Sequence, residues 1–248
     1  MKPQPTCDFM QKTVKRVKTF IEGFDEKLNG GIPVKNVVLI AGEPGTLKST
    51  IAFYILYHNA LNEFIPGVYI TLEQGRESIL SNMEGLGLDY SRVDKRLSVV
   101  DLGMIRKHIE NLGESTWMEI FKMYADNLKA TTDYQLFVID SLPVLEMLAE
   151  LKNPRNELFH FFEWLRDLDV TTFVITEMKP NSLEYCHFGE DFLADGILHV
   201  KMEQVDEVTV QRRIRCVKMR NTGHSTNFYT LMLENGVLQV TRVLSEKT

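Results

Sequence analysis

The chain has 248 residues, of which 44% are apolar and 25% charged, and its formal net charge is −6. These values are typical of a soluble globular protein and exclude collagen-like and low-complexity chains. The three cysteines, Cys7, Cys186 and Cys216, show no paired spacing, so neither a zinc site nor a disulfide framework is expected. No segment approaches the roughly 18 consecutive apolar residues of a membrane span, and residues 1–12 lack the apolar core of a signal peptide. We therefore expect a cytoplasmic protein without membrane insertion, and the acidic balance makes nucleic acid an unlikely partner.

Short apolar runs alternate with longer segments of helical periodicity along most of the chain. Residues 1–17 are predicted to form a polar N-terminal tail, and residues 18–248 a single domain. The apolar runs are rich in β-branched residues and apolar on both faces, as strands covered by helices on two sides must be. The predicted strands are 36–41, 67–72, 97–101, 135–140 and 171–176. The predicted helices are 48–62, 76–86, 115–130 and 156–168.

The pattern changes after about residue 196. Four further strands are predicted at 197–204, 208–220, 227–233 and 237–243, and the segment ENG at 234–236 is a typical hairpin turn. The earlier alternation of strands and helices indicates βαβ units and a mainly parallel sheet. The predicted fold is therefore α/β, a mainly parallel central sheet flanked by helices with a C-terminal antiparallel extension.

The strongest motif is GEPGTLKST at residues 42–50, directly after the first strand of the alternating region and opening a helix. A phosphate chain needs backbone N–H groups curled around it, a helix N-terminus aimed at it and a cation beside it. The pattern G-x-x-x-x-G-K-[ST] is satisfied except at its second glycine, which is Leu47. The alternative is an ordinary turn that contains Lys-Ser. The residues expected to bind the nucleotide are Gly42, Glu43, Pro44, Gly45, Thr46, Leu47, Lys48, Ser49 and Thr50.

Within this loop, Lys48 is expected to reach the β- and γ-phosphates, Ser49 to ligate Mg²⁺ and Thr50 to contact the inner phosphates. Leu47 stands where a Cβ is poorly tolerated in most phosphate loops. It must either adopt a strained conformation or divert the loop, and we expect it to slow hydrolysis. The alternative is that Leu47 packs against a subunit interface without affecting catalysis.

Carboxylates follow two of the predicted strands. Asp140 ends the run LFVID and is the candidate for the metal shell. Glu73 follows GVYITL, at the same predicted edge of the sheet, and is the candidate base for the attacking water; an acidic helix cap is the alternative. Gln74 could orient the same water, and Thr176 and Glu177 could sense the γ-phosphate.

Taken together, the chain resembles a KaiC-like domain of the RecA-type ATPase superfamily. The resemblance covers about residues 16–243, through the phosphate loop and the segments YITLEQ, LFVIDS, VITE, FLADGI and KMRNTGH. It implies an ATP- and Mg²⁺-dependent RecA-like core that assembles into homo-oligomeric, usually hexameric rings with ATP between subunits. Cyanobacterial clock members carry two such domains, whereas this chain carries one, like single-domain archaeal relatives. Clock function is not inferred.

The resemblance also implies roles for two further regions. The family normally has two adjacent glutamates at the position of Glu73 and Gln74, so the first is retained as catalytic base and the second is an amide. The family's K-x-R, which reaches the neighbouring subunit's nucleotide, corresponds to Lys218 and Arg220, with His224 nearby. In a strand, residues 218 and 220 share one face, as a pair of cations offered to an adjacent phosphate would. The alternative is a solvated polar face.

Three functions are compatible with these features. The first is a slow ring ATPase that acts as a regulatory or signalling module with an unidentified protein partner. The second is a nucleotide-binding switch with little turnover, like FlaH, which Leu47 and Gln74 favour and Glu73 disfavours. The third is a recombinase-like DNA-binding ATPase, for which the arginines of 212–215 are the single supporting feature. We expect those arginines at a subunit interface or on an edge strand.

Overall fold

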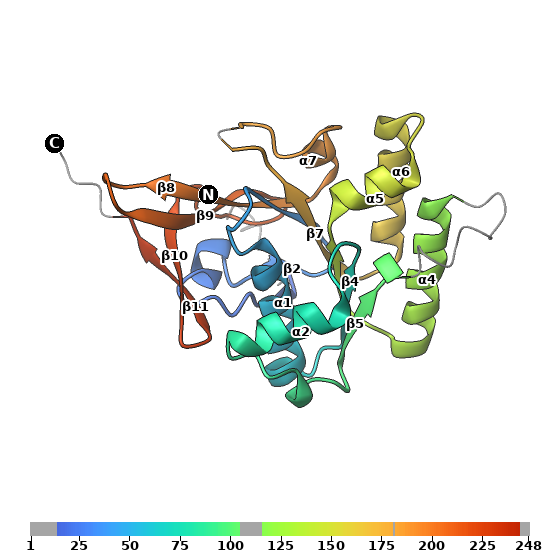
Figure 1. Cartoon of the computed structure of the whole chain (residues 1–248), viewed down its shortest axis with the longest axis horizontal. Coiled ribbons are helices and arrows are strands. Elements are labelled where there is room, and N and C mark those ends of the chain that lie inside the picture. Colours follow the sequence, from blue (N-terminus) through green and yellow to red (C-terminus); the bar gives the residue numbers. More distant parts are fainter. Residues whose placement is uncertain (1–13, 105–115, 181, 244–248) are drawn as a thin grey trace, which may run out of the picture.

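The computed structural model describes residues 14–104, 116–180 and 182–243. Its centre is a nine-stranded sheet in the order β11-β10-β9-β8-β3-β7-β6-β4-β5 (Figure 1). The strands are β3 (Val37–Gly42), β4 (Gly67–Thr71), β5 (Leu97–Asp101), β6 (Leu136–Asp140), β7 (Thr171–Glu177), β8 (Gly196–Gln204), β9 (Val210–Met219), β10 (Tyr229–Glu234) and β11 (Val237–Arg242).

The sheet has a parallel part and an antiparallel part, as predicted. Strands β3 to β8 pair in parallel, and β8 pairs antiparallel with β9, from which β10 and β11 continue. The predicted hairpin at 234–236 is confirmed: Glu234 pairs with Val237, and Asn235 and Gly236 have φ values of 51° and 79°. Two positive φ values are what a two-residue hairpin turn needs.

Helices cover both faces of the sheet, as Figure 1 shows. One face packs against α1 and α2, and the other against α4, α5 and α6, which gives two apolar clusters separated by the sheet. No helix in the described residues is long and apolar enough to cross a membrane. The α-helices are α1 (Lys48–His58), α2 (Arg76–Gly85), α4 (Trp117–Thr132), α5 (Leu142–Ala149), α6 (Pro154–Asp167) and α7 (Glu190–Leu193). A π-helical turn, η2 (Asn59–Glu63), follows α1, and short 3₁₀ turns are η1 (Asp25–Leu28) and η3 (Tyr90–Arg92).

The predicted strands end within two residues of the observed ones, but several short elements were not predicted. Helices α5 and α7 were missed. The prediction of a polar tail through residue 17 is wrong at its end, because Arg16–Val17 forms β1 and pairs with β2 (Ile32–Pro33). Val17 is buried in the apolar cluster on the face of the sheet that α1 and α2 cover, so side-chain packing holds this segment in place. Residues 1–13, the rest of the predicted tail, lie outside the described residues.

Candidate functional site

The residues predicted to act on a nucleotide meet at the edge of the sheet where the parallel strands end. Strands β3, β7, β6 and β4 are neighbours in that order. Gly42 at the end of β3 is in register with Glu177 at the end of β7, and Asp140 at the end of β6 is in register with Thr71 at the end of β4. Glu73 follows Thr71 by two residues. An open parallel sheet binds its ligands at this edge, so the topology places the three carboxylates beside the phosphate loop.

The phosphate loop is a tight backbone curl between β3 and α1. Gly42 lies so close to β8 that a Cβ would overlap the carbonyl oxygen of Val200 and lie 2.9 Å from Thr46 Oγ1. Thr46 is buried, and its hydroxyl donates a hydrogen bond of 2.7 Å to the carbonyl of Glu43, which closes the curl. Helix α1 begins at Lys48, so the unpaired N–H groups of its first turn lie at the end of the loop. This is the backbone arrangement that binds phosphate.

Lys48 supplies the cation of the loop. Its ammonium donates a hydrogen bond of 3.0 Å to the carbonyl of Glu43. Burial lowers the pKa of the Lys48 ammonium, and the carboxylates of Glu177, Asp140 and Glu73 act in the opposite direction. These effects agree with the strand register, which places Glu177 at the end of β7, Asp140 at the end of β6 and Glu73 just after β4 at the edge where Lys48 lies. A bound phosphate chain would need additional positive charge beside it.

Leu47 adopts a strained backbone conformation, which is one of the two possibilities that the sequence left open. Its φ and ψ are 72° and 25°, in the left-handed region, and it is the N-cap of α1. Its carbonyl accepts the first helical hydrogen bond, from Ile51 N at 2.8 Å. A non-glycine residue in this region costs about 1–3 kcal/mol. The half-buried side chain packs against the apolar cluster beneath α1, so part of this cost is offset within the chain itself.

Asp140 and Ser49 form the candidate metal site. Burial raises the pKa of Asp140, and hydrogen bonds with Tyr69 and Ser49 oppose that shift. Within the described ranges, no group of three or more His, Cys, Asp and Glu side chains could hold a metal ion. Oxygen ligands from one hydroxyl and one carboxylate fit Mg²⁺, which keeps several waters and takes its other ligands from phosphate. Ser49 and Asp140 therefore fit a cation that arrives with a nucleotide.

Glu73 is oriented by a neighbouring strand. The hydroxyl of Ser141, directly after Asp140, donates a hydrogen bond of 2.7 Å to Glu73 Oε1. The Glu73 side chain is exposed to solvent. Gln74 begins the connection to α2, and its backbone N–H and carbonyl bond to the Thr71 hydroxyl at 3.1 and 2.8 Å. The turn and the serine together aim an accessible carboxylate at the space beside the phosphate loop.

Lys218, Arg220 and His224 lie away from the loop of their own chain. Lys218 is paired with Ile197 at the start of β8, beside the start of β3, whereas the phosphate loop follows the end of β3. The Lys218 ammonium donates to the carbonyls of Asp191 and Ala194 at 3.0 and 2.7 Å. Arg220 follows the last residue of β9 and forms an ion pair of 2.7 Å with Asp195, one residue after Ala194. That residues 218 and 220 share one face of a strand stays a prediction.

His224 lies in the loop after β9, where its Nδ1 is 3.1 Å from the carbonyl of Thr222.

Arg212 is a contact of the phosphate loop that the sequence analysis missed. Its Nε donates a hydrogen bond of 3.1 Å to the carbonyl of Gly45. The edge-strand alternative does not hold for β9 as a whole, because β9 lies between β8 and β10 and pairs with β10 at Arg213 and Ile214. The alternative of a subunit interface stays a prediction. Arg213 donates to the Thr230 hydroxyl and Arg215 to the Tyr185 hydroxyl, so both are engaged within the chain. Arg212 reaches the loop because it pairs with Met202 on β8. The sequence does not fix this register, so it holds no signal that would reveal the contact.

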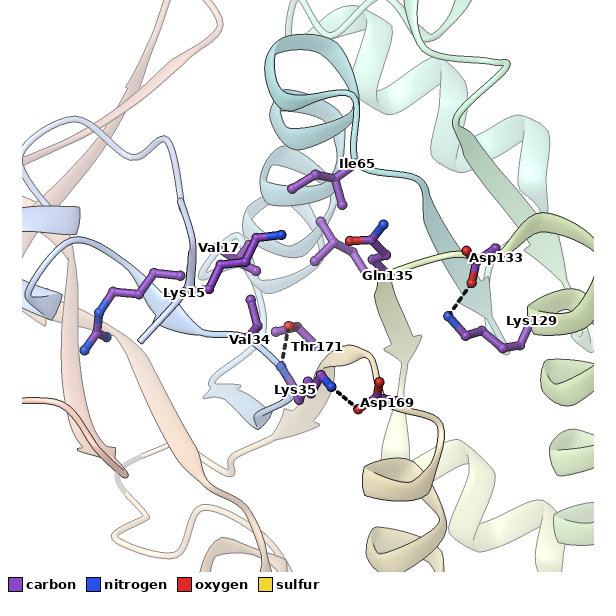
Figure 2. A pocket seen from close by; sticks show the side chains of 12 residues that line it. Lys15, Val17, Val34, Lys35, Ile65, Lys129, Asp133, Gln135, Asp169 and Thr171 are labelled. Atoms are coloured by element: carbon purple, nitrogen blue, oxygen red, sulfur yellow. Dashed lines mark hydrogen bonds and ion pairs between the residues drawn. The ribbon is translucent and has the colours of Figure 1, made fainter. Parts of the chain in front are cut away.

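A cavity of about 270 Å³ lies at the opposite edge of the sheet, where β6 and β7 begin (Figure 2). Two of its lysines are already paired: Lys35 with Asp169 at 2.5 Å and Lys129 with Asp133 at 3.0 Å. Figure 2 shows both pairs at the rim. The cavity is therefore separate from the edge that carries the phosphate loop.

Comparison with known proteins identifies the family. The family model of the KaiC ATPase matches residues 17–245. The chain belongs to the KaiC ATPase family. The UPF0273 protein of Aeropyrum pernix is 32% identical over 225 residues, which cover 86% of this chain and 88% of that protein. The crystal structure of a KaiC-like protein from Pyrococcus horikoshii OT3 superposes with a TM-score of 0.79 at 28% identity, over 92% of this chain and 99% of that one.

Circadian clock proteins are also similar. Circadian clock oscillator protein KaiC 1 of Synechocystis sp. is 28% identical over 241 residues, which cover 94% of this chain and 45% of that protein. The chain thus spans about half the length of the clock proteins that it matches. Membership of the KaiC family confirms the RecA-like fold and supports an ATPase at the level of the family.

The contact between the loop and β8 makes a prediction about Gly42. Gly42→Ala should lower the free energy of unfolding by about 1–3 kcal/mol, because the new methyl group meets the backbone carbonyl of Val200, which is fixed in the sheet. Urea denaturation measures this. The matched control is Gly85→Ala at the end of α2, where a Cβ meets no atom within 4 Å, and stability should stay equal or rise by up to about 1 kcal/mol. Equal stability of the two variants would contradict the close approach.

Proposed function

We propose that this chain is a Mg²⁺-dependent, ATP-binding ATPase with slow turnover that works in a homo-oligomeric ring as a regulatory or signalling module. The observation that carries this proposal is the strand register that brings Glu177, Asp140 and Glu73 to the edge of the sheet where Lys48 begins helix α1. A structural ion pair would need one carboxylate. Three of them near a half-buried ammonium indicate a site built for phosphate, metal and water together.

The chain's own residues have separable roles in this mechanism. Lys48 exchanges the carbonyl of Glu43 for phosphate oxygens, and the N–H groups of the loop and of α1 hold the same chain of phosphates. Ser49 and Asp140 would hold Mg²⁺, which offsets the phosphate charge when it is bound. Glu73, held by Ser141, accepts the proton of a water molecule placed in line with the terminal phosphate.

Slow turnover follows from the phosphate loop. Positioning supplies much of the catalysis of phosphoryl transfer, so a small change in loop path lowers the rate. The left-handed Leu47 directs its side chain into the apolar cluster and thereby ties the backbone of the loop to the packing of α1. Gln74 adds to this, because an amide stands where the family usually has a second glutamate.

Assembly through the nucleotide is the second part of the proposal. The family resemblance assigns Lys218 and Arg220 to the neighbouring subunit's nucleotide, with His224 beside them. Their place near the start of β3, away from their own phosphate loop, supports this assignment, since only another copy could bring them to a nucleotide. The carbonyls of Asp191 and Ala194 now accept hydrogen bonds from Lys218, and the Asp195 carboxylate accepts one from Arg220. These contacts would keep both side chains ordered before assembly.

A nucleotide-binding switch with little turnover is the second candidate. The strained Leu47 favours it, because a loop tied to the packing of α1 can bind nucleotide without positioning it for attack. The ordered contact between Ser141 and Glu73 favours the ATPase. Measured turnover separates the two.

Lys48→Ala tests nucleotide binding. We expect the affinity for ATP in the presence of Mg²⁺ to fall about tenfold or more, on the order of 1.4 kcal/mol, because the variant removes the ammonium beside the phosphates. Isothermal titration calorimetry measures it. Lys95→Ala, at an exposed position before β5, is the control and should bind as the wild type does. Equal affinity of Lys48→Ala and wild type would refute the assignment of the loop.

Turnover tests the roles of Glu73 and Leu47 together. We expect slow phosphate release by the wild type, none by Glu73→Gln and faster release by Leu47→Gly, because glycine takes the left-handed conformation without strain. Glu84→Gln on the exposed face of α2 controls for charge and should leave the rate unchanged. If Leu47→Gly leaves the rate unchanged or lowers it, Leu47 is an accommodated part of the loop and does not limit the rate.

Sedimentation tests assembly. ATP should favour the oligomer if Lys218 and Arg220 act across an interface, because it then binds the assembled form better than the monomer. A mixture of Glu73→Gln and Arg220→Ala chains should recover part of the turnover that each lacks alone, since some interfaces then combine an intact loop with an intact arginine. A strict monomer at micromolar concentration with and without ATP, or a mixture without recovered activity, would exclude the trans role.

A further inference from the structure

A phenol hydroxyl reaches the carboxylate of the candidate metal site. Tyr69 lies in the middle of β4, on the face of the sheet that packs against α1, and its side chain is fully buried. Its hydroxyl donates a hydrogen bond to Asp140 Oδ2. Tyr69 thus joins the middle of β4 to the carboxylate at the end of β6.

Packing alone does not account for this hydroxyl. The ring of Tyr69 packs against Phe53 of α1, with ring centroids 5.9 Å apart, and phenylalanine would fill the same space. A buried hydroxyl costs free energy unless it is hydrogen-bonded, and this one is bonded to the half-buried carboxylate of Asp140. Hydrogen bonds to an ionised acceptor are shorter and stronger than neutral ones. The hydroxyl therefore fixes the carboxylate in one orientation.

We propose that Tyr69 is a positioning residue for the divalent cation: its hydroxyl holds Asp140 in the arrangement that binds the cation with the nucleotide. Tyr69 itself does not contact the cation. Asp140 sits at the end of a strand, where its side chain would otherwise be free to rotate, and the hydroxyl removes that freedom before the ligand arrives. This is how a surrounding hydrogen bond raises metal affinity in preorganised sites. The inference rests on the proposed function, because it concerns the same site.

The test is the Mg²⁺ dependence of binding of a fluorescent ATP analogue to Tyr69→Phe. The Mg²⁺ concentration for half-maximal binding should rise about threefold to tenfold, as expected for the loss of the net contribution of one hydrogen bond. Binding of the analogue in EDTA should stay within about twofold of the wild type, because the loop and Lys48 are unchanged. The readout is equilibrium binding and needs no turnover.

Tyr134→Phe is the matched control. Tyr134 is equally buried, and its hydroxyl donates a hydrogen bond of 3.2 Å to the carbonyl of Ala125, in the cluster on the other face of the sheet. Tyr134→Phe removes a buried hydroxyl of the same kind, so any general loss of stability should appear in both variants. Urea denaturation measures that loss. Its Mg²⁺ dependence should equal that of the wild type.

A double-mutant cycle with Asp140→Asn separates positioning from packing. If Tyr69 acts through Asp140, Tyr69→Phe should leave the Mg²⁺ dependence of the Asp140→Asn chain unchanged. A further shift in that background, or a Tyr69→Phe variant that loses affinity equally with Mg²⁺ and with EDTA, would overturn the proposal.

The wild type distinguishes this proposal from the one on which it rests. A wild-type chain whose analogue binding does not respond to Mg²⁺ would refute both. A wild-type response that Tyr69→Phe leaves unchanged would refute the role of Tyr69 alone.

Discussion

The register of four neighbouring parallel strands is the constraint on which the site depends. It aligns the ends of β3, β7, β6 and β4, so residues far apart in sequence surround one ammonium. The result is an excess of negative charge: Glu177, Asp140 and Glu73 face Lys48, and a triphosphate would add more. In a partly buried site such repulsion is weakly screened. Three sources would supply the missing positive charge: a divalent cation, Arg212 at the loop and cations from a neighbouring chain. Metal binding and assembly would then both follow from the same electrostatic requirement.

Much of this arrangement could be predicted because it is local in sequence. The phosphate loop is one continuous segment, and Asp140 and Glu73 each follow an apolar run that reads as a strand. Parallel sheets align their carboxyl ends, so strand ends alone predict that these residues meet. Arg16–Val17 shows the limit: a two-residue strand has no periodicity, and its order comes from pairing with Ile32–Pro33 and from burial of Val17.

The features that could not be predicted depend on register or on side-chain reach. Arg212 touches the loop because it pairs with Met202, two residues beyond the partner of Gly42, and nothing in the sequence of β9 fixes that pairing. Tyr69 follows the alternation of a buried strand and reads as core. Its hydroxyl is seen to be a hydrogen-bond donor only when the register of β4 and β6 places Asp140 beside it.

Leu47 shows how a departure from a motif can be accommodated without loss of the fold. The loop keeps the left-handed backbone that the missing glycine would have provided, so the path toward the phosphates is retained at a cost in strain. The side chain recovers part of that cost by packing beneath α1, whose first turn carries Ser49 and Thr50. The strain is therefore located one residue from the lysine and two from the metal-binding serine. The same packing that stabilises the loop also couples its position to the core, so under the proposed function one side chain would affect both the fold and the rate of turnover.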